Sequence, residues 1–315
     1  MGSLESENDN LEKAQILKEV EVTSKRKKQM YALMIFLVFS WGLEYILAKN
    51  ALDALEPMTL LLFKYTAGFW LMLILKLKFE KRSFFRKKDI PLFIVCALFG
   101  DLGYFYSEYT AMSYLPVSLI TITLAFMPVL SVIIERIVYK RKASRKMLLG
   151  IMSTIVGIGF IIGLDYESLA SGRATGYILA FSAVIMWNLY NFITASLHDK
   201  YETITLTLNQ QICAILLVLP YGLTHLPQWD DLTPGIVGGV LYLGIISAGI
   251  GFIIVVKSLK ILGPTVTAMF SNFLPVTTTF FGWLLLKETI LPLQMVGGII
   301  VLGAGYFVIK EKSRM

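Results

Sequence analysis

The chain contains 315 residues, of which 56% are hydrophobic and only 16% are charged, and its formal net charge is +7. About a quarter of the residues of a soluble domain are charged, so this chain lacks the charge to cover a surface that faces water. Its two cysteines and two histidines are too few and too scattered for a disulfide framework or a cysteine-based metal motif. We therefore expect an integral membrane protein that holds no metal and no cofactor.

Apolar runs long enough to cross a bilayer recur along the whole chain. The hydrocarbon core requires about 20 apolar residues per helix, and polar or proline-containing breaks separate ten such runs. We expect helices at 30–48, 59–77, 91–111, 117–138, 147–163, 176–196, 204–223, 235–256, 265–286 and 293–309. The runs are apolar all round rather than at every second residue, which predicts an all-α membrane bundle and not a barrel.

Basic residues gather at alternate ends of these runs. The clusters at 25–28, 76–88 and 136–146 fall on the N-terminal side, whereas the opposite side carries few basic residues and several acids. The positive-inside rule then predicts a protein of the cytoplasmic (inner) membrane with both termini in the cytoplasm. Topology explains the net positive charge, so we expect membrane lipids as partners of the basic loops and no nucleic acid.

The sequence repeats itself with an offset of about 146 residues. The aligned pairs include Trp41 with Trp187, Asp53 with Asp199, Pro128 with Pro275 and Gly150 with Gly297. Each unit holds five predicted spans, an odd number, so the second unit must cross the membrane in the opposite direction. Inverted repeats are a recurring transporter design, with the binding site near the midplane between them. We therefore expect ten transmembrane helices arranged as two inverted five-helix repeats.

These observations divide the chain into five parts. They are a polar cytoplasmic N-terminal tail (1–28), a first repeat (29–163), an extracytoplasmic linker (164–175), a second repeat (176–309) and a short cytoplasmic tail (310–315). The N-terminal tail shows only a short helical pattern, around 11–20. The first span has no convincing cleavage site and has a counterpart in the second repeat, so we expect it to be retained.

The closing segment, residues 263–309, resembles the last spans of an EamA repeat of the drug/metabolite transporter superfamily. The residues that carry the resemblance are Pro275 in mid-span, Lys287-Glu288 at the membrane edge and Gly297 at the start of the last helix. The first repeat has its proline and glycine at matching places, but Arg141 stands where the family usually has an acid. The resemblance covers about residues 30–310 and implies a ten-helix bundle with a central cavity. It says little about the substrate.

Charged residues inside the predicted spans are functional candidates, because a charge at mid-depth costs on the order of 3 kcal/mol and usually faces a cavity. Glu44 in the first span and Lys64 in the second lie at similar depths below the outer surface and are predicted to pair. This pair is either a structural link between two helices or a gate. Asp101 lies near the middle of the third span, and Glu108 lies nearer its outer end.

Three helix faces combine aromatic with polar side chains at helical spacing. The predicted lining of the cavity consists of Trp41, Glu44 and Tyr45, then Asp101, Tyr104 and Glu108, then Trp187, Tyr190 and Asn191, and finally Ser271 and Asn272. An aromatic stripe alone is more often packing, but interleaved acids and amides favour a binding role. Pro128 and Pro275 are predicted hinges, because a proline within a helix frees a backbone carbonyl.

Together these features favour a secondary transporter over an enzyme. The sequence lacks a P-loop pattern, so ATP does not drive it directly, and the spans hold no nucleophile with a base. Carboxylates among Trp and Tyr suit a small polar metabolite with a positive charge, an amino acid or an organic cation or amine. We expect alternating access, with proton coupling left open, in a monomer or homodimer. The alternatives are a receptor or scaffold without flux, and a carrier of neutral or lipophilic drug-like solutes.

The topology can be tested by labelling single cysteines in intact cells. With Asp53→Cys or Asp230→Cys, an impermeant thiol reagent should react from outside. Both positions lie in loops between spans, and these loops are predicted to face the outside of the cell. Lys87→Cys should remain unlabelled until the membrane is permeabilised. Labelling of Lys87→Cys in intact cells would contradict the orientation.

Overall fold

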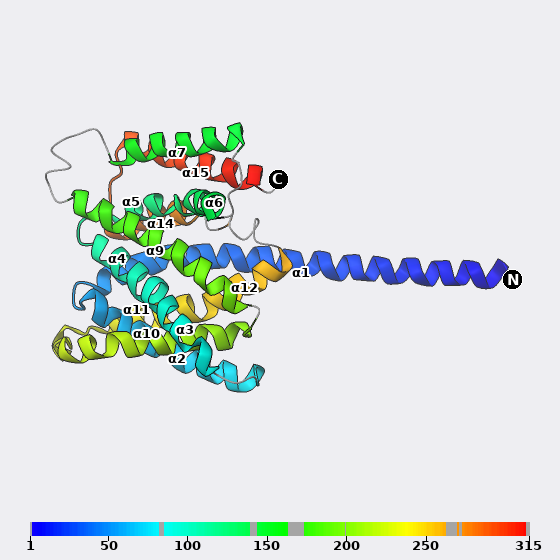
Figure 1. The fold of residues 1–315 in the computed structure, drawn as a ribbon, viewed down its shortest axis with the longest axis horizontal. Coiled ribbons are helices and arrows are strands. Elements are labelled where there is room, and N and C mark those ends of the chain that lie inside the picture. The colour runs from blue at the N-terminus through cyan, green and yellow to red at the C-terminus, as the bar shows by residue number, and fades with distance from the viewer. Residues whose placement is uncertain are drawn as a thin grey trace.

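The computed structural model describes residues 2–81, 85–138, 144–162, 173–198, 200–262, 270 and 273–312. All regular secondary structure in this part of the chain is helical, and it contains no strand. The helices lie roughly along one direction and pack into a single bundle (Figure 1). The sequence-based prediction of an all-helical protein is therefore confirmed.

The first half of the chain supplies five helical segments, two of which change geometry along their length. Their elements are α1 (Gly2–Ala51), α2 (Pro57–Phe79), η1 (Lys87–Asp89), α3 (Ile90–Cys96), η2 (Ala97–Tyr104), α4 (Phe105–Ala111), α5 (Val117–Leu124), α6 (Met127–Val138) and α7 (Arg145–Ile162). Elements η1 to α4 follow one another without a break and correspond to the predicted third span. Elements α5 and α6 are separated by a turn and correspond to the fourth.

The second half repeats this order. Its elements are α9 (Ala174–His198), α10 (Thr203–Thr224), η4 (Trp229–Asp231), α11 (Pro234–Leu241), η5 (Tyr242–Gly251), α12 (Phe252–Ile261), α14 (Leu274–Leu286) and α15 (Pro292–Lys312). Elements α11, η5 and α12 are continuous and form the counterpart of the η1 to α4 segment. Most of the predicted span boundaries agree with these helix ends to within a few residues.

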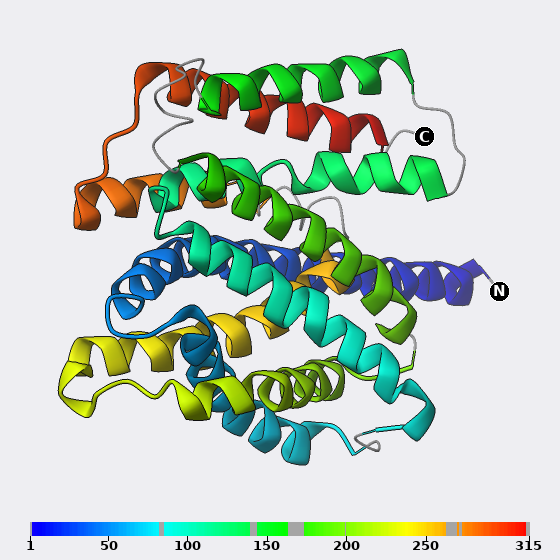
Figure 2. The same ribbon diagram turned by 60° about the vertical axis from the view of Figure 1, so that its left-hand side comes forward.

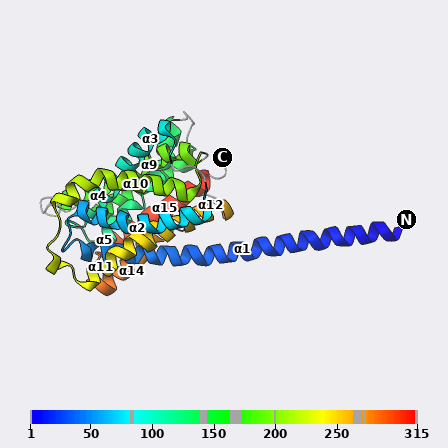
Figure 3. The same cartoon turned by 90° about the horizontal axis from the view of Figure 1, so that it is seen from below.

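Helix α1 is much longer than the predicted first span. It runs unbroken from Gly2 to Ala51, and its N-terminal part extends far beyond the bundle (Figure 3). The sequence analysis expected only a short helical pattern in this tail. Between Ser3 and Lys28 the chain has neither glycine nor proline, so nothing interrupts a helix once the apolar span has nucleated it.

Length and composition identify the protein as a multi-pass membrane protein. Within the described residues, six helical stretches are long and apolar enough to cross a membrane: Lys25–Ala51, Pro57–Phe79, Lys87–Ala111, Ala174–Thr194, Thr203–Thr224 and Pro234–Val255. Three further apolar helices are shorter, namely Leu148–Ile161, Leu274–Leu286 and Pro292–Val308. Large apolar side chains such as Ile178, Trp283 and Ile299 are exposed on the outside of the bundle, where a bilayer would cover them.

Helices at equivalent places in the two halves pack against each other antiparallel. Near the start of α2, Thr59 Oγ1 donates to the carbonyl of His225 at the end of α10, over 3.0 Å. At the opposite end, Glu80 beyond α2 accepts from the backbone N–H of Thr205 at the start of α10, over 2.7 Å. Helices α7 and α15 form a second such pair along one edge of the bundle (Figure 2).

Two stretches depart from α-helical geometry at equivalent places in the halves. Elements η2 and η5 are π-helical, and about 146 residues separate them. The sequence analysis expected uninterrupted α-helices there. Both stretches contain several glycines, whose low helix propensity makes the wider turn less costly, and π-helical turns occur frequently at functional sites.

The two mid-span prolines begin new helices rather than kinking continuous ones. Pro128 follows the turn at residues 125–126 as the second residue of α6, and Pro275 is the second residue of α14. Proline fits the first turn of a helix because the N–H that it lacks has no partner there. The role of these two prolines as hinges stays a prediction, and the structure shows that both lie next to breaks between helices.

A glycine contact between α7 and α15 gives a test of the fold. A Cβ atom on Gly157 would lie 2.9 Å from the carbonyl oxygen of Gly297, and one on Gly297 would lie 2.6 Å from the carbonyl oxygen of Gly157. Gly157→Ala should therefore lower stability by about 1–3 kcal/mol, as overpacking does. Gly159→Ala is the control, since nothing lies within 4 Å of its Cβ position. The unfolding temperature measured in detergent should fall for Gly157→Ala and stay unchanged for Gly159→Ala.

Candidate functional site

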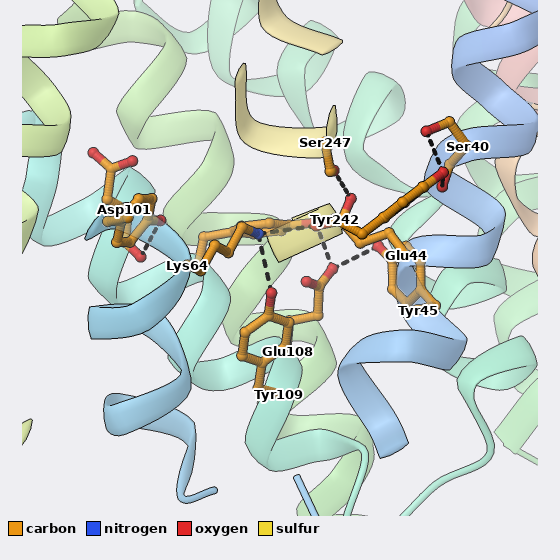
Figure 4. Close-up of polar contacts among 11 residues, drawn as sticks. Ser40, Glu44, Tyr45, Lys64, Asp101, Glu108, Tyr109, Tyr242 and Ser247 are labelled. Carbon is orange, nitrogen blue, oxygen red and sulfur yellow. Dashed lines mark hydrogen bonds and ion pairs between the residues drawn. The ribbon is translucent and has the colours of Figure 1, made fainter. Parts of the chain in front are cut away.

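The most deeply buried charge in the described structure belongs to Lys64 of α2, which is 1% exposed. Its Nζ atom lies 2.9 Å from Glu44 Oε1 and donates to the hydroxyl of Tyr109 over 3.0 Å. It also lies 3.6 Å from the centre of the Phe105 ring, a favourable position for a cation. The predicted ion pair thus exists, and it joins α1, α2 and α4 (Figure 4).

The second oxygen of Glu44 reaches across to the other half of the protein. Glu44 Oε2 accepts a short hydrogen bond from the hydroxyl of Ser247, in the π-helical stretch η5. The carboxylate of one buried residue therefore holds a lysine of the first half and a serine of the second. Glu44 therefore links α1 to both α2 and η5. Removing one partner of the buried ion pair would cost about 3–5 kcal/mol, because the other charge would stay buried without a partner.

A second buried carboxylate lies next to the ion pair but has a different environment. Glu108 of α4 is 2% exposed, and its Oε1 atom accepts from the hydroxyls of Tyr45 over 2.6 Å and Tyr104 over 2.5 Å. Within the described residues, the donors to the Glu108 carboxylate are thus neutral phenols, whereas the Glu44 carboxylate accepts from the charged ammonium group of Lys64. The predicted grouping of Tyr45, Tyr104 and Glu108 is present in the structure.

Asp101 lies apart from this network. Figure 4 places its carboxylate away from Glu44 and Glu108, and its Oδ2 atom is buried without a hydrogen-bond partner. α-Helical spacing predicts Asp101, Tyr104 and Glu108 on one face, but Asp101 lies in the π-helical stretch η2, whose wider turn changes the angle between successive side chains. The backbone carbonyl of Asp101, not its carboxylate, accepts from Tyr65 over 2.9 Å.

Aromatic rings connect the two halves beside these acids. The ring centres of Tyr104 and Trp187 are 4.8 Å apart, and those of Trp187 and Tyr190 are 5.1 Å apart. A Cβ atom on Gly100 would lie 2.2 Å from the Tyr190 ring, so only glycine admits this ring against η2. The predicted aromatic faces of the third and sixth spans therefore meet, next to Asp101.

The buried contacts of the two halves occupy equivalent places with different chemistry. In the repeat register, the counterparts of Glu44 and Lys64 are Tyr190 and Gln210. They are hydrogen-bonded as well: Tyr190 donates to Gln210 Oε1 over 3.2 Å, and Gln210 Nε2 donates to Thr194 over 3.2 Å. The first half thus holds an ion pair where the second half holds a neutral pair.

Other predicted site residues lie outside this cluster. Trp41 packs with its Nε1 atom 3.1 Å from the Cβ position of Gly251, in a separate apolar cluster. Asn191 is exposed, whereas the preceding Tyr190 is buried, because successive residues of an α-helix point about 100° apart. Ser271 and Asn272 lie outside the described residues. No group of three or more metal-binding side chains occurs in the part of the chain that the structure describes.

Three contacts of Lys64 and Glu44 were missed by sequence reasoning. Tyr109 and Phe105 belong to the same predicted span as Glu108 but were not among the predicted site residues, because an aromatic side chain carries no sign of its partner. Ser247 had a usable signal, since it is the counterpart of Gly100 and adjoins that of Asp101 in the repeat register. A polar residue at that place in the second half indicates a contact at the interface between the halves.

The sequence matches the profile of the EamA-like transporter family over residues 28–163 and again over residues 174–310. The chain belongs to the EamA-like transporter family. The two matched stretches coincide with the two halves described above, so the family's unit is present twice. The resemblance first seen in the closing segment is thereby confirmed for almost the whole chain.

Curated relatives of this family member are transporters and not enzymes. An uncharacterized transporter of Bacillus subtilis (strain 168), YyaM, is 22% identical over 276 residues, covering 86% of this chain and 90% of the relative. A probable amino-acid metabolite efflux pump of Salmonella typhimurium (strain LT2) is 22% identical over 295 residues, covering 89% of this chain and 94% of the pump. One crystal structure matches with a TM-score of 0.61 at 16% identity, over 88% of this chain and 98% of that chain, which establishes the fold alone.

The ion pair can be tested by a double-mutant cycle. Lys64→Met should lower the free energy of unfolding by about 3–5 kcal/mol, because Glu44 is then a buried acid without a cation. The double variant with Glu44→Gln should recover most of this loss, since the pair is coupled. Thermal unfolding of the purified protein measures both effects, and Lys78→Met, at an exposed position, is the neutral control. A double variant no more stable than Lys64→Met would contradict the pairing.

Proposed function

We propose that this protein is a secondary transporter that moves a small polar metabolite with a positive charge, an amino acid or an organic cation or amine, across the cytoplasmic membrane. The observation that carries this proposal is the imbalance of buried charge. Glu44 is neutralised by Lys64, whereas Glu108 has phenols as donors and Asp101 has a buried oxygen without a partner. Both uncompensated acids come from the third predicted span.

An uncompensated buried acid is costly unless a cation or a proton reaches it. The neighbouring rings of Tyr104, Trp187 and Tyr190 suit an ammonium group, because a cation over an aromatic face gains about 0.5–2 kcal/mol. Among the described residues beside these acids, the cation that could meet a strongly anionic solute is Lys64, and Lys64 already holds Glu44. The efflux pump of Salmonella typhimurium, whose name refers to an amino-acid metabolite, agrees with this substrate class.

Alternating access is the mechanism that we infer, with ten spans in two inverted repeats. The antiparallel pairing of α2 with α10 and of α7 with α15 supports the inversion, because each pair consists of equivalent helices. The N-terminal end of α1 and the C-terminal end of α15 emerge at the same end of the bundle (Figures 1 and 2), which supports an even number of spans. The basic clusters favour the cytoplasm for that end.

Proton coupling follows from the same acids. An acid that is protonated while the site is empty and ionised while a cation is bound links the two occupancies, since each excludes the other. Asp101 is the acid nearest mid-depth and the one with an open hydrogen-bonding position, so we assign this role to it. The Glu44–Lys64 pair then serves to join helices beside the site.

The proposal predicts a specific loss in Asp101→Asn. The variant should fold with near-native thermal stability, because the buried Oδ2 atom has no hydrogen bond to lose, yet transport or its pH dependence should disappear. The measurement is uptake of labelled amino acids, polyamines and quaternary amines into vesicles containing the purified protein. Substrates are chosen beforehand by a thermal-shift screen of the same compounds.

Asp230→Asn is the matched control, since Asp230 is an exposed acid in the short element η4, and transport by this variant should equal that of the parent protein. Normal pH-dependent transport in Asp101→Asn would overturn the role of Asp101. Binding of these compounds without any flux would favour a receptor, and flux of neutral lipophilic solutes alone would favour the drug-like alternative.

A further inference from the structure

A single acid near the C-terminal end of α14 holds together three helices from both halves. Glu288 Oε1 accepts from the backbone N–H of Val117 over 2.8 Å, and its Oε2 accepts from the backbone N–H and the hydroxyl of Ser118 over 3.2 and 2.7 Å. The Nζ atom of Lys49, near the end of α1, lies 3.5 Å from Glu288 Oε1. The Glu288 side chain is 7% exposed. It thus caps α5 and ties it to α14 and α1.

The local backbone is shaped to admit this carboxylate. Helix α14 ends at Lys287, whose φ of 57° is left-handed, and this turns Glu288 back towards the helix end. Opposite it, a Cβ atom on Gly282 would lie 2.7 Å from Glu288 Oε2 and 2.9 Å from the Ser118 hydroxyl. A left-handed lysine is unfavourable, so the sequence accepts local strain to place this acid.

Two of the helices that Glu288 joins, α5 and α14, are short segments next to breaks. Helix α5 has eight residues and is followed by the turn at 125–126, and α14 begins just after a turn at Phe273. Each segment can therefore tilt without moving a long helix. The two lie side by side (Figure 1), so opening this end of the bundle between them requires the Glu288 contact to break.

Glu80 uses the same chemistry in a rigid setting. Its carboxylate accepts from the backbone N–H groups of Ile204 and Thr205 and from the Thr205 hydroxyl, over 2.9, 2.7 and 2.7 Å. It caps α10 next to α2, however, and these two helices have 22 and 23 residues and are also joined at their other ends by Thr59. Loss of the Glu80 contact therefore leaves the two helices paired.

The repeat-equivalent position of Glu288 is not acidic. In the repeat register its place in the first half falls at Arg141, a residue outside the described part of the chain. An arginine has no acceptor for backbone N–H groups. The position equivalent to Glu288 in the first half therefore does not encode a carboxylate cap.

We propose that Glu288 is a latch that holds the end of the bundle opposite the termini closed, and that its release from Val117 and Ser118 is the step that opens this end. The carboxylate gains charge-assisted hydrogen bonds at a helix N-terminus while closed, and water replaces these bonds when the end opens. The proposal rests on the proposed function only in taking this opening as a step of transport. Opening itself is measurable without a substrate.

The test measures the exposure of a buried reporter below the latch. Thr278 of α14 is fully buried and lies one turn from Gly282 on the same helix face. Thr278→Cys is introduced after Cys96 and Cys213 are changed to alanine, and the purified full-length protein in detergent is treated with a charged methanethiosulfonate reagent. Adding Glu288→Gln should raise the labelling rate about tenfold, the factor that corresponds to about 1.4 kcal/mol.

Glu80→Gln is the matched control, because it weakens an equivalent cap but should leave the labelling rate unchanged while lowering the unfolding temperature. Equal labelling of Glu288→Gln and its parent would overturn the proposal, and so would an equal rise in both variants. A second measurement covers the case in which Glu288→Gln does not fold. Ser118→Cys paired with Glu288→Cys should suppress labelling of the reporter on oxidation, with recovery after reduction, and labelling that oxidation leaves unchanged would also overturn the latch.

The labelling result stands apart from the proposed function. A higher labelling rate without flux of any tested amine would keep the latch and count against the substrate class. Flux with an unchanged labelling rate would keep the transporter and remove the latch.

Discussion

A lysine ammonium inside a membrane bundle is tolerated only where its charge is neutralised and its N–H groups are accepted. Lys64 meets both conditions at Glu44, at Tyr109 and over Phe105, and Glu44 in turn accepts from Ser247. These partners come from three elements, α1, α4 and η5, which belong to both halves, so the positions of these elements relative to α2 depend on one charge.

The two halves share a framework but not a chemistry. Where the first half has an acid facing a lysine, the second has Tyr190 facing Gln210. Where Ser247 meets Glu44, the equivalent Gly100 makes room for the Tyr190 ring. One side of the interface is therefore charged and the other is neutral and aromatic. An interface of this kind places acids and aromatic faces side by side, which a chemically symmetric pair of repeats would not.

In the described part of the bundle, the carboxylates of Glu80 and Glu288 both accept from backbone N–H groups at a helix N-terminus, and their surroundings give these contacts different consequences. Glu80 joins two long helices that pack along their whole length, so its contact adds stability to an interface that exists without it. Glu288 joins two short segments next to helix breaks, so its contact limits a movement. The same set of donors thus serves as a structural cap in one place and a closure in the other, because the length and continuity of the helices decide what the loss of the contact allows.

Composition and patterning by themselves determined the helical membrane fold, the approximate ends of the helices and the internal repeat, because apolar runs of bilayer length have one stable form in lipid. Depth along two predicted spans also sufficed to pair Glu44 with Lys64. Only the tertiary structure separated Asp101 from Glu108, since the π-helical turn between them follows from packing and not from residue spacing. Only the tertiary structure showed that Ser247 contacts Glu44 and that Val117 contacts Glu288. Those partners lie about 170 to 200 residues apart in the chain, and no local pattern indicates which distant helix will face a given side chain.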